Sequence, residues 1–456
     1  MAYSSYIRHR GKGMRPARVI ALGFALLILA GALLLSLPAA SADGSEKDML
    51  TCLFTSTSAT CVTGLVLADT GTEWSVFGQA VILVLIQIGG LGFITMAMSF
   101  SIIMKRSISP KQRLLLAHSF NLSSFNGIVR LTKYIVRGTL FFEIIGTICL
   151  MTRFVPLFGW KTGIWRSVFT SVSAFCNAGF DLMGDYSGSF SSLSAFSGDF
   201  TVCITVMLLI VTGGIGFVVW NEIVELIFKK RQLSVYSKFV MISSAVLILI
   251  GAAVFLLSEW NNPGTLGNLP AGEKILASFF QSITTRTAGF NTVSMVDMNP
   301  GTKLMFLLLM FIGGCSGSTA GGVKVGTFSV SVWTVLCVLM GKSDIVIFGR
   351  RISRDTILRA FSVIVLHFCV TVIGGLIILT CGCGIMQAMF EAFSASGTVG
   401  LTLSLTGSMN EAGKITAMLL MYFGRVGILT VSYAVLARLS QAKPEFRNAE
   451  AKLLIG

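Results

Sequence analysis

Charged side chains are scarce in this sequence. Asp, Glu, Lys and Arg together make up 12% of its 456 residues, whereas 54% of the residues are hydrophobic. A soluble protein of this length needs more charge to cover its surface, so the soluble classes are excluded. Two apolar stretches, 19–39 and 239–257, also reach the ~20 residues with which a helix crosses a bilayer. The composition therefore predicts an integral membrane protein.

Histidine is rarer still, with three residues in the chain. His9 and His118 lie in basic segments, and His367 is alone in an apolar stretch. This pattern provides no nucleophile–base set and no group of metal ligands. The ten cysteines show no spacing typical of a disulfide framework or a metal site. We therefore expect no enzymatic activity and no organic cofactor.

Acidic residues are fewer than basic ones, which gives a formal net charge of +15. Lys and Arg gather in short polar segments, such as 105–113, 229–238 and 342–359, while intervening segments such as 259–273 carry little positive charge. This alternation follows the positive-inside rule and argues against a nucleic-acid partner. The sequence predicts a multi-pass protein in the lipid bilayer of a cell membrane, with both termini and the basic segments in the cytoplasm.

Four short segments share small hydroxyl residues that lead to a glycine followed by an apolar residue. The segments are 55–65 (TSTSATCVTGL), 170–180 (TSVSAFCNAGF), 282–290 (SITTRTAGF) and 391–401 (EAFSASGTVGL). A second, glycine-rich signature follows each of them, at 89–92, 213–216, 313–314 and 424–427. Two signatures in a constant order indicate four copies of one unit.

Each copy places its polar segment between two long apolar stretches. First helices are expected near 17–39, 131–155, 236–258 and 356–380, and second helices near 76–104, 200–228, 302–340 and 412–438. The polar segments are too short to span, so each must enter and leave the membrane on one side. We predict an all-α membrane fold with eight spanning helices and four pore helices around a pseudo-fourfold central pore. The repeats are 1–113, 114–235, 236–350 with a broken second helix, and 351–456.

The glycine of each polar segment suits a cation filter made of backbone carbonyls. Thr398-Val399-Gly400 repeats the start of the potassium-filter pattern TVGYG. Glycine allows the torsions that aim successive carbonyls inward, and the preceding short helix would direct its negative end toward the cation. No ring of carboxylates accompanies these segments, so we expect carbonyl dipoles to bind K⁺. The predicted filter residues are Thr63, Gly64, Ala178, Gly179, Ala288, Gly289, Val399 and Gly400.

The third repeat contains a run of small residues inside its second apolar span. Such a run disfavours a helix interior, because each glycine costs about 1 kcal/mol relative to alanine. One interpretation is a close helix-packing face; the other is a flexible intramembrane loop that obstructs conduction. The predicted gate residues are Gly313, Gly314, Ser316, Gly317, Ser318, Thr319, Ala320, Gly321 and Gly322, with Lys324 at the end of the loop.

Four polar side chains near these segments also have predicted roles. Arg425 replaces a signature glycine within the last span, where an arginine faces a cavity or a partner. It is either an electrostatic barrier at the gate or a structural cation bound to helix-end carbonyls. Arg286 would repel cations inside the filter, so we expect it behind the filter as a brace. Asn177 and Asn291 flank filter glycines and are expected to support the loops by hydrogen bonding.

With these motifs the chain resembles the Trk/Ktr/HKT superfamily of potassium-translocating proteins over nearly its full length. The run from Gly313 to Lys324 resembles the gating loop of Ktr proteins, and the chain is most similar to the bacterial Ktr membrane subunit. The resemblance implies K⁺ uptake across the bacterial plasma membrane, with Na⁺ left open as a coupling or activating ion. It also implies a homodimer with one pore per protomer, bound to a cytoplasmic ring of nucleotide-binding regulatory subunits.

An alternating-access carrier for monovalent cations is the main alternative function. Such carriers commonly combine inverted repeats with a substrate site at the midplane, whereas the repeats here run parallel and favour an axial pore. A transport rate above the turnover of a carrier would distinguish the two. The basic segments 105–113 and 342–359 are the expected docking surface for cytoplasmic partners.

Overall fold

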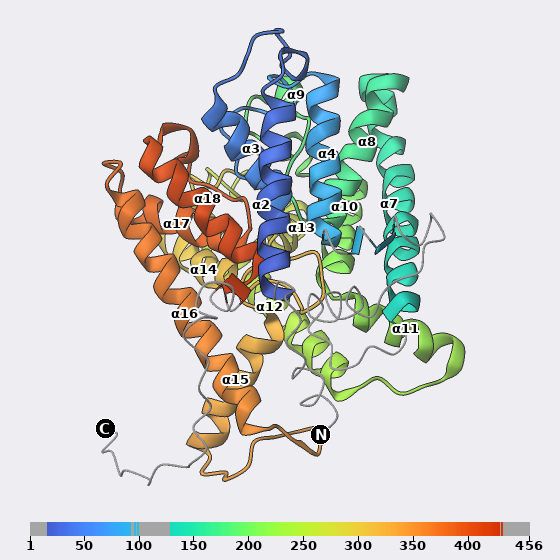
Figure 1. Ribbon diagram of the computed structural model, residues 1–456, viewed down its shortest axis with the longest axis vertical. Helices are drawn as coiled ribbons and strands as arrows, with labels where there is room; N and C mark the ends of the chain where they lie inside the picture. Colours follow the sequence, from blue (N-terminus) through green and yellow to red (C-terminus); the bar gives the residue numbers. More distant parts are fainter. Residues whose placement is uncertain (1–15, 93–94, 97, 100–127, 429, 432–456) are drawn as a thin grey trace.

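The computed structural model describes residues 16–92, 95–96, 98–99, 128–428 and 430–431 (Figure 1). This part of the chain is predominantly helical. Its one small sheet is an antiparallel ribbon of β1 (Val346–Ile347) and β2 (Arg350–Arg351), in which Val346 pairs with Arg351. The segment 105–113, expected to dock cytoplasmic partners, lies outside the described residues, as does His118.

Four helices in the described part are long and apolar enough to cross a membrane. They are α2 (Pro16–Leu35), α7 (Ile128–Phe158), α12 (Val235–Glu259) and α16 (Arg354–Leu379). Less than a third of the most apolar window of each helix is buried inside the protein, so most of that surface is available to lipid. The predicted membrane class and helical fold are confirmed, and each of these helices overlaps a predicted first helix.

A short helix follows each long one and packs against it. These helices are α3 (Met49–Cys61), α8 (Trp160–Phe175), α13 (Ala271–Thr284) and α17 (Ile385–Gly397). In three of the pairs a serine hydroxyl on the short helix donates to a carbonyl on the long helix, at 2.7–2.8 Å. The pairs are Ser56 with Ile28, Ser171 with Glu143, and Ser282 with Ile248.

Glycines on the long helices make these serine contacts possible. A Cβ added to Gly31, Gly146 or Gly251 would lie 2.4–2.6 Å from the partner serine Oγ. This distance is shorter than a van der Waals contact, so a larger residue would push the two helices apart. The three contacts form an additional repeat signature, which the sequence comparison of the polar segments did not detect.

The second helices are shorter than the sequence predicts. They are α4 (Val76–Leu91), α10 (Phe200–Gly214), α14 (Pro300–Phe311) and α18 (Glu411–Val426). Gly92, Gly216 and Gly427 follow three of them with φ of +83°, +98° and +89°, a backbone conformation that ends a right-handed helix. The second helices predicted over 76–104, 200–228 and 412–438 are therefore each interrupted at a glycine.

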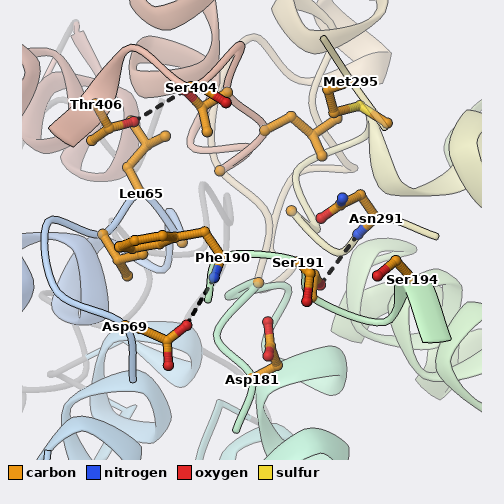
Figure 2. Close-up of a pocket in the computed structure, with 18 of the residues that line it drawn as sticks. Leu65, Asp69, Asp181, Phe190, Ser191, Ser194, Asn291, Met295, Ser404 and Thr406 are labelled. Atoms are coloured by element: carbon orange, nitrogen blue, oxygen red, sulfur yellow. Dashed lines mark hydrogen bonds between the residues drawn. The ribbon is translucent and has the colours of Figure 1, made fainter. Parts of the chain in front are cut away.

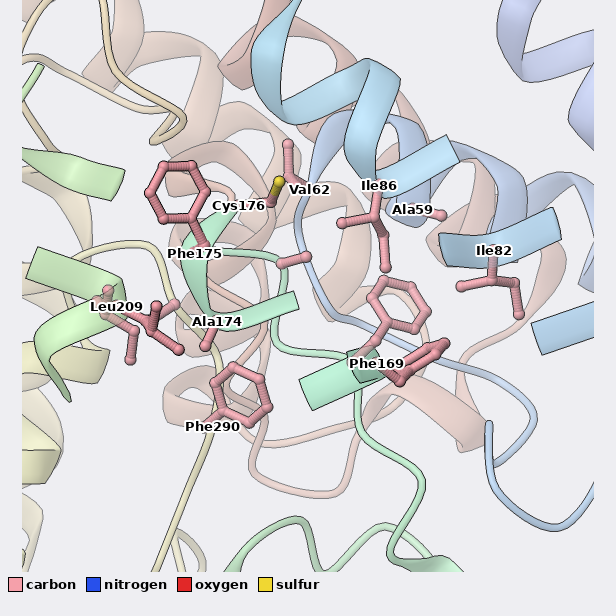
Figure 3. Packing of buried hydrophobic residues seen from close by; sticks show 14 of the residues in the cluster. Ala59, Val62, Ile82, Ile86, Phe169, Ala174, Phe175, Cys176, Leu209 and Phe290 are labelled. Atoms are coloured by element: carbon pink, nitrogen blue, oxygen red, sulfur yellow. The ribbon is translucent and has the colours of Figure 1, made fainter. Parts of the chain in front are cut away.

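Two of the second helices are followed by another described helix. Helix α11 (Phe217–Lys229) lies at 100° to α10, and α15 (Val325–Leu339) follows α14 after a non-helical segment. Figure 1 shows α11 and α15 at the end of the molecule opposite α9 (Gly184–Ser187). An apolar cluster packs α3, α4, α8 and α10 together, with Phe169, Phe175 and Ile86 among its members (Figure 3). This packing fixes the ends of the short helices near the centre of the protein.

Candidate functional site

The four glycines of the polar segments meet in a closed ring. A Cβ added to each would lie within 2.7 Å of a carbonyl oxygen from the next segment around the ring. The contacts run from Gly64 to Ala178 (2.5 Å), Gly179 to Ala288 (2.7 Å), Gly289 to Val399 (2.5 Å) and Gly400 to Thr63 (2.2 Å). We call Gly64, Gly179, Gly289 and Gly400 the glycine ring. The structure thus brings all eight predicted filter residues together.

The backbone alternates in the same way at each member of the ring. The four glycines have φ between +71° and +95°, and the residue two positions earlier also has positive φ. These earlier residues are Val62 (55°), Asn177 (57°), Thr287 (71°) and Thr398 (52°). Left-handed torsions are uncommon in non-glycine residues, and β-branched side chains rarely adopt them. Sequence reasoning identified the glycines and Asn177 but missed Val62, Thr287 and Thr398, because Val and Thr give no local signal for positive φ.

A cavity of about 450 Å³ opens on one side of the ring (Figure 2). All four ring glycines line it, together with residues that follow them in the chain, such as Leu65 and Leu401. Two carboxylates, Asp69 and Asp181, also line the cavity. Asp69 accepts hydrogen bonds from the backbone of Gly71 (3.0 Å) and Phe190 (2.9 Å), which holds the loops around the cavity.

Asp181 is the cavity's titratable group with a displaced pKa. It follows Gly179 by two residues, and its Oδ1 accepts a hydrogen bond from Met183 N at 3.0 Å. Burial, assisted by the neighbouring charge of Asp69, raises the pKa of Asp181 to about 6 against the opposing effects of the Met183 N–H and Arg166. Its carboxyl group therefore changes charge in mildly acidic solution, directly beside the ring. Sequence reasoning did not identify this residue.

The opposite side of the ring is covered by residues 312–324, which we call the 312–324 loop. This segment is non-helical between α14 and α15, and Gly313 N donates to Val323 O at 2.8 Å across its base. Thr319 Oγ1 donates to Phe175 O at 3.2 Å, and a Cβ on Gly321 would lie 2.2 Å from Thr398 Oγ1. Phe175 and Thr398 precede the ring glycines, so the loop and the cavity lie on opposite sides of the ring.

The loop is held by the ends of neighbouring helices. Cys315 N donates to Gly214 O (2.9 Å), Thr319 N donates to Gly213 O (3.2 Å), and Gly322 N donates to Gly424 O (3.3 Å). These carbonyls come from the glycine-rich signatures of the second and fourth repeats. The interpretation of the small residues as a helix-packing face does not fit, because the run is not helical.

Two basic side chains donate hydrogen bonds to carbonyls at this loop. Arg425 donates to the carbonyl of Thr319 in the loop, and its Nη2 donates to Gly89 O (2.5 Å) and Gly90 O (2.7 Å) at the end of α4. Lys324 Nζ donates to Ala320 O (2.6 Å) and Gly321 O (3.2 Å) within the loop. Arg425 thus joins the loop to helix-end carbonyls, the contacts expected of a structural cation.

The remaining predicted residues lie beside the ring. Arg286 lies between α12 and the 312–324 loop: its guanidinium donates to Ser244 O (3.3 Å), Ser244 Oγ (3.2 Å) and Gly313 O (3.5 Å). The Asn177 side-chain amide lies 3.3 Å from Thr319 Oγ1, between the ring and the loop. Asn291 lies on the cavity side, where its backbone N–H donates to Ser192 Oγ at 3.4 Å (Figure 2).

The signature glycines have a packing role that the sequence did not reveal. A Cβ on Gly89, Gly213 or Gly424 would lie 1.9–2.1 Å from the carbonyl oxygen of Thr60, Phe175 or Ser396, respectively. Each of these carbonyls lies at the end of the short helix in the same repeat. The signature therefore lets the second helix touch the backbone that leads into the ring, which is the reason for a glycine at that point.

Comparison with known proteins identifies the family to which the chain belongs. Residues 26–445 match the TrkH family, described as cation transport proteins, and the chain belongs to this family. It is therefore a membrane transport protein, and the expectation that it is not an enzyme is confirmed. The crystal structure of the potassium transporter TrkH from Vibrio parahaemolyticus shares the fold, with a TM-score of 0.72 and 18% identity, covering 95% of this chain and 87% of that one.

Two curated relatives match almost from end to end. The chain is 39% identical over 436 residues to the Ktr system potassium uptake protein B of Bacillus subtilis, which covers 95% of this chain and 96% of the relative. It is 38% identical over 450 residues to the potassium/sodium uptake protein NtpJ of Enterococcus hirae, covering 98% of both. The resemblance to the Trk/Ktr group is thus confirmed.

Proposed function

We propose that this protein takes up K⁺ across the bacterial plasma membrane through a filter formed by the glycine ring. The single observation that carries the proposal is the closed cycle of contacts from Gly64 through Gly179, Gly289 and Gly400 back to Gly64. Carbonyls of Thr63, Ala178, Ala288 and Val399 face the neighbouring segments of the cycle, so oxygens from four directions can replace the water around one ion.

Two features of the surrounding backbone favour a cation over an anion. Helices α3, α8, α13 and α17 end three to five residues before the ring glycines, so their negative ends point at the ring. The alternation of positive and negative φ allows successive carbonyls to face the same side of the chain. Asp69 and Asp181 add negative charge in the cavity, where it raises the local cation concentration.

The 312–324 loop is proposed as the gate and Arg425 as its electrostatic partner. The loop lies directly beneath the ring, and Arg425 brings a positive charge to the same place. A cation leaving the filter would meet both. Backbone hydrogen bonds tie the loop to Gly213 and Gly214 at the end of α10 and to Gly424 on α18, so a shift of either helix would move the loop.

The membrane arrangement follows from the same interpretation. We propose four parallel repeats with eight membrane-crossing segments, the 450 Å³ cavity outside the cell and the basic segments inside. The predicted partners remain a second copy of the chain and a cytoplasmic ring of nucleotide-binding subunits. The name of the Enterococcus hirae relative, a potassium/sodium uptake protein, supports Na⁺ as a further transported or coupling ion.

The experiment that tests this function is ⁸⁶Rb⁺ uptake into liposomes that contain the purified protein. An outward K⁺ gradient is expected to drive Rb⁺ accumulation, and external K⁺ should compete with Rb⁺ much better than Na⁺ or Li⁺ does. Liposomes without protein provide the background. Equal competition by all three ions would contradict a filter that replaces the hydration shell of K⁺.

Asp181 predicts a dependence of uptake on external pH. Above pH 6 the Asp181 carboxylate is charged and attracts cations into the cavity; as the pH falls through about 6 it is protonated and that attraction is lost. The KM for Rb⁺ should therefore rise in acid, by about two- to fivefold for a charge worth ~1 kcal/mol. Asp181→Asn should show the raised KM at pH 7.5 and no further change at pH 5.5.

A matched control is Asp48→Asn, which removes an exposed carboxylate that does not line the cavity. It should keep both the native KM and the native pH profile. A pH profile that is the same in native protein and Asp181→Asn would contradict the role given to Asp181.

A further inference from the structure

A groove of about 680 Å³ lies between the first turns of α7 and helix α11, away from the glycine ring. Because α11 turns by 100° from α10, it crosses the end of α7 instead of continuing along it (Figure 1). One part of the groove is lined by basic side chains and the other by aromatic and aliphatic ones. Such a division suits a ligand with a charged head and an apolar body.

The basic part consists of three side chains on one helix. Arg130, Lys133 and Arg137 are spaced at i, i+3 and i+7, so they share one face of α7, and all three are exposed. Within the described residues, no carboxylate forms an ion pair with them. The nearest acidic side chains on α11 are engaged elsewhere: Glu222 accepts from Ser234 N (2.9 Å), and Glu225 lies 3.6 Å from Lys229 Nζ.

The apolar wall is rigid and preformed. Trp220 Nε1 donates to Thr212 O at 2.9 Å, and its ring packs against Phe142 and Phe217, with centroids 5.1 Å and 5.3 Å away. Gly138 on α7 permits this approach, since a Cβ there would lie 3.0 Å from the Trp220 ring. Next to this wall Phe141 is 59% exposed, so an apolar surface continues out of the groove.

Helix α11 has the features of a helix that lies in a membrane interface. Its exposed Ile227 and Phe228 are 66% and 79% accessible and immediately precede the basic residues Lys229, Lys230 and Arg231. Apolar side chains beside Lys and Arg are typical of interfacial helices, which bury the former among acyl chains and extend the latter to head groups. The groove is then at the level of the lipid head groups.

We propose that this groove binds an anionic glycerophospholipid from the leaflet on the basic side of the protein. The phosphate would contact Arg130, Lys133 and Arg137, and an acyl chain would lie along Phe141, Phe142 and Trp220. The positive charge of the groove favours an anionic head group, and its aromatic wall provides an apolar surface for the acyl chain. The choice of leaflet rests on the membrane orientation given under the proposed function, whereas the binding itself does not depend on transport.

Native mass spectrometry of the purified full-length protein tests the proposal by titration with dioleoyl phosphatidylglycerol and, separately, dioleoyl phosphatidylcholine. The native chain is expected to retain phosphatidylglycerol at lower concentration than phosphatidylcholine. In the triple variant R130Q/K133Q/R137Q the apparent affinity for phosphatidylglycerol should fall about a hundredfold, from roughly fivefold for each of the three cations. Binding of phosphatidylcholine should stay unchanged.

The matched control is R350Q/R354Q/R359Q, which removes the same charge from three exposed arginines outside the groove. Its affinity for phosphatidylglycerol should lie within about twofold of the native value, a difference of ~0.4 kcal/mol that the titration can just resolve. The charge-preserving R130K/R137K variant, with a native melting temperature, should also retain the lipid. The proposal would be overturned if the control lost as much affinity for phosphatidylglycerol as the triple variant, or if the triple variant bound this lipid as the native chain does. It would also be overturned if the triple variant changed the oligomeric state of the protein and left lipid binding unchanged.

Discussion

Replacing Gly400 by serine is expected to lower ⁸⁶Rb⁺ uptake at least about tenfold and to reduce the preference for K⁺ over Na⁺. The glycine has φ of +95°, and a Cβ at this position would lie 2.2 Å from the carbonyl oxygen of Thr63. A left-handed torsion alone costs a non-glycine residue about 1–2 kcal/mol, and the collision must also move a carbonyl of the ring. Because ~1.4 kcal/mol equals a factor of ten, a displaced carbonyl has a large effect on ion binding.

A control variant separates the effect of the positive φ from the effect of the collision with a ring carbonyl. Gly188 has nearly the same φ, +97°, but a Cβ there would meet nothing within 4 Å. Gly188→Ser should therefore leave the K⁺ preference unchanged, even if it lowers the melting temperature slightly. Gly64→Ser provides a second member of the ring, with a Cβ 2.5 Å from Ala178 O, and should also lose selectivity. Unchanged selectivity in both ring variants would remove the filter assignment.

Deleting residues 316–320 is expected to raise cation flux by about tenfold or more. These residues carry Thr319, whose carbonyl binds Arg425 and whose hydroxyl donates to Phe175 O beneath the ring. The hydrogen bond from Val325 N to Gly314 O lies outside the deletion, so the base of the loop can still close. Removing an obstruction worth ~1.4 kcal/mol accelerates passage tenfold.

A point substitution tests the gate independently, in case the deletion variant does not fold. Arg425→Gln removes the positive charge while an amide can still donate to a carbonyl, so flux should rise with little change in melting temperature. Arg153→Gln is the matched control: Arg153 pairs with Asp199 away from the loop, so its loss should not raise flux. Unchanged or reduced flux in a folded deletion variant and in Arg425→Gln would reject the gate.

The sequence predicted those elements and site residues whose conformation depends on the local residue types alone. Gly64, Gly179, Gly289 and Gly400 could be found because glycine is the residue that tolerates their torsions, and because four copies occur in register. The 312–324 loop was predictable for a related reason, since its small residues disfavour a helix. Long apolar runs gave α2, α7, α12 and α16 within a few residues.

The features that were missed depend on residues far apart in the sequence. The contact of Gly213 with Phe175 O, or of Gly31 with Ser56 Oγ, exists only when two helices cross at that point. Thr398 and Val62 are held at positive φ by the surrounding structure, against their own preference. Gly92 and Gly427 were interpreted as helix interior, because a single glycine in an apolar run does not show whether the helix ends there.

The most direct measurement is the position of a bound ion. Crystals of the protein soaked in Rb⁺ or Tl⁺ should give an anomalous peak on the axis of the glycine ring, coordinated by the carbonyl oxygens of Thr63, Ala178, Ala288 and Val399. Replacement by Li⁺ should remove the peak. A map at the same resolution with no ion inside the ring, or with the four segments separated from one another, would contradict the account.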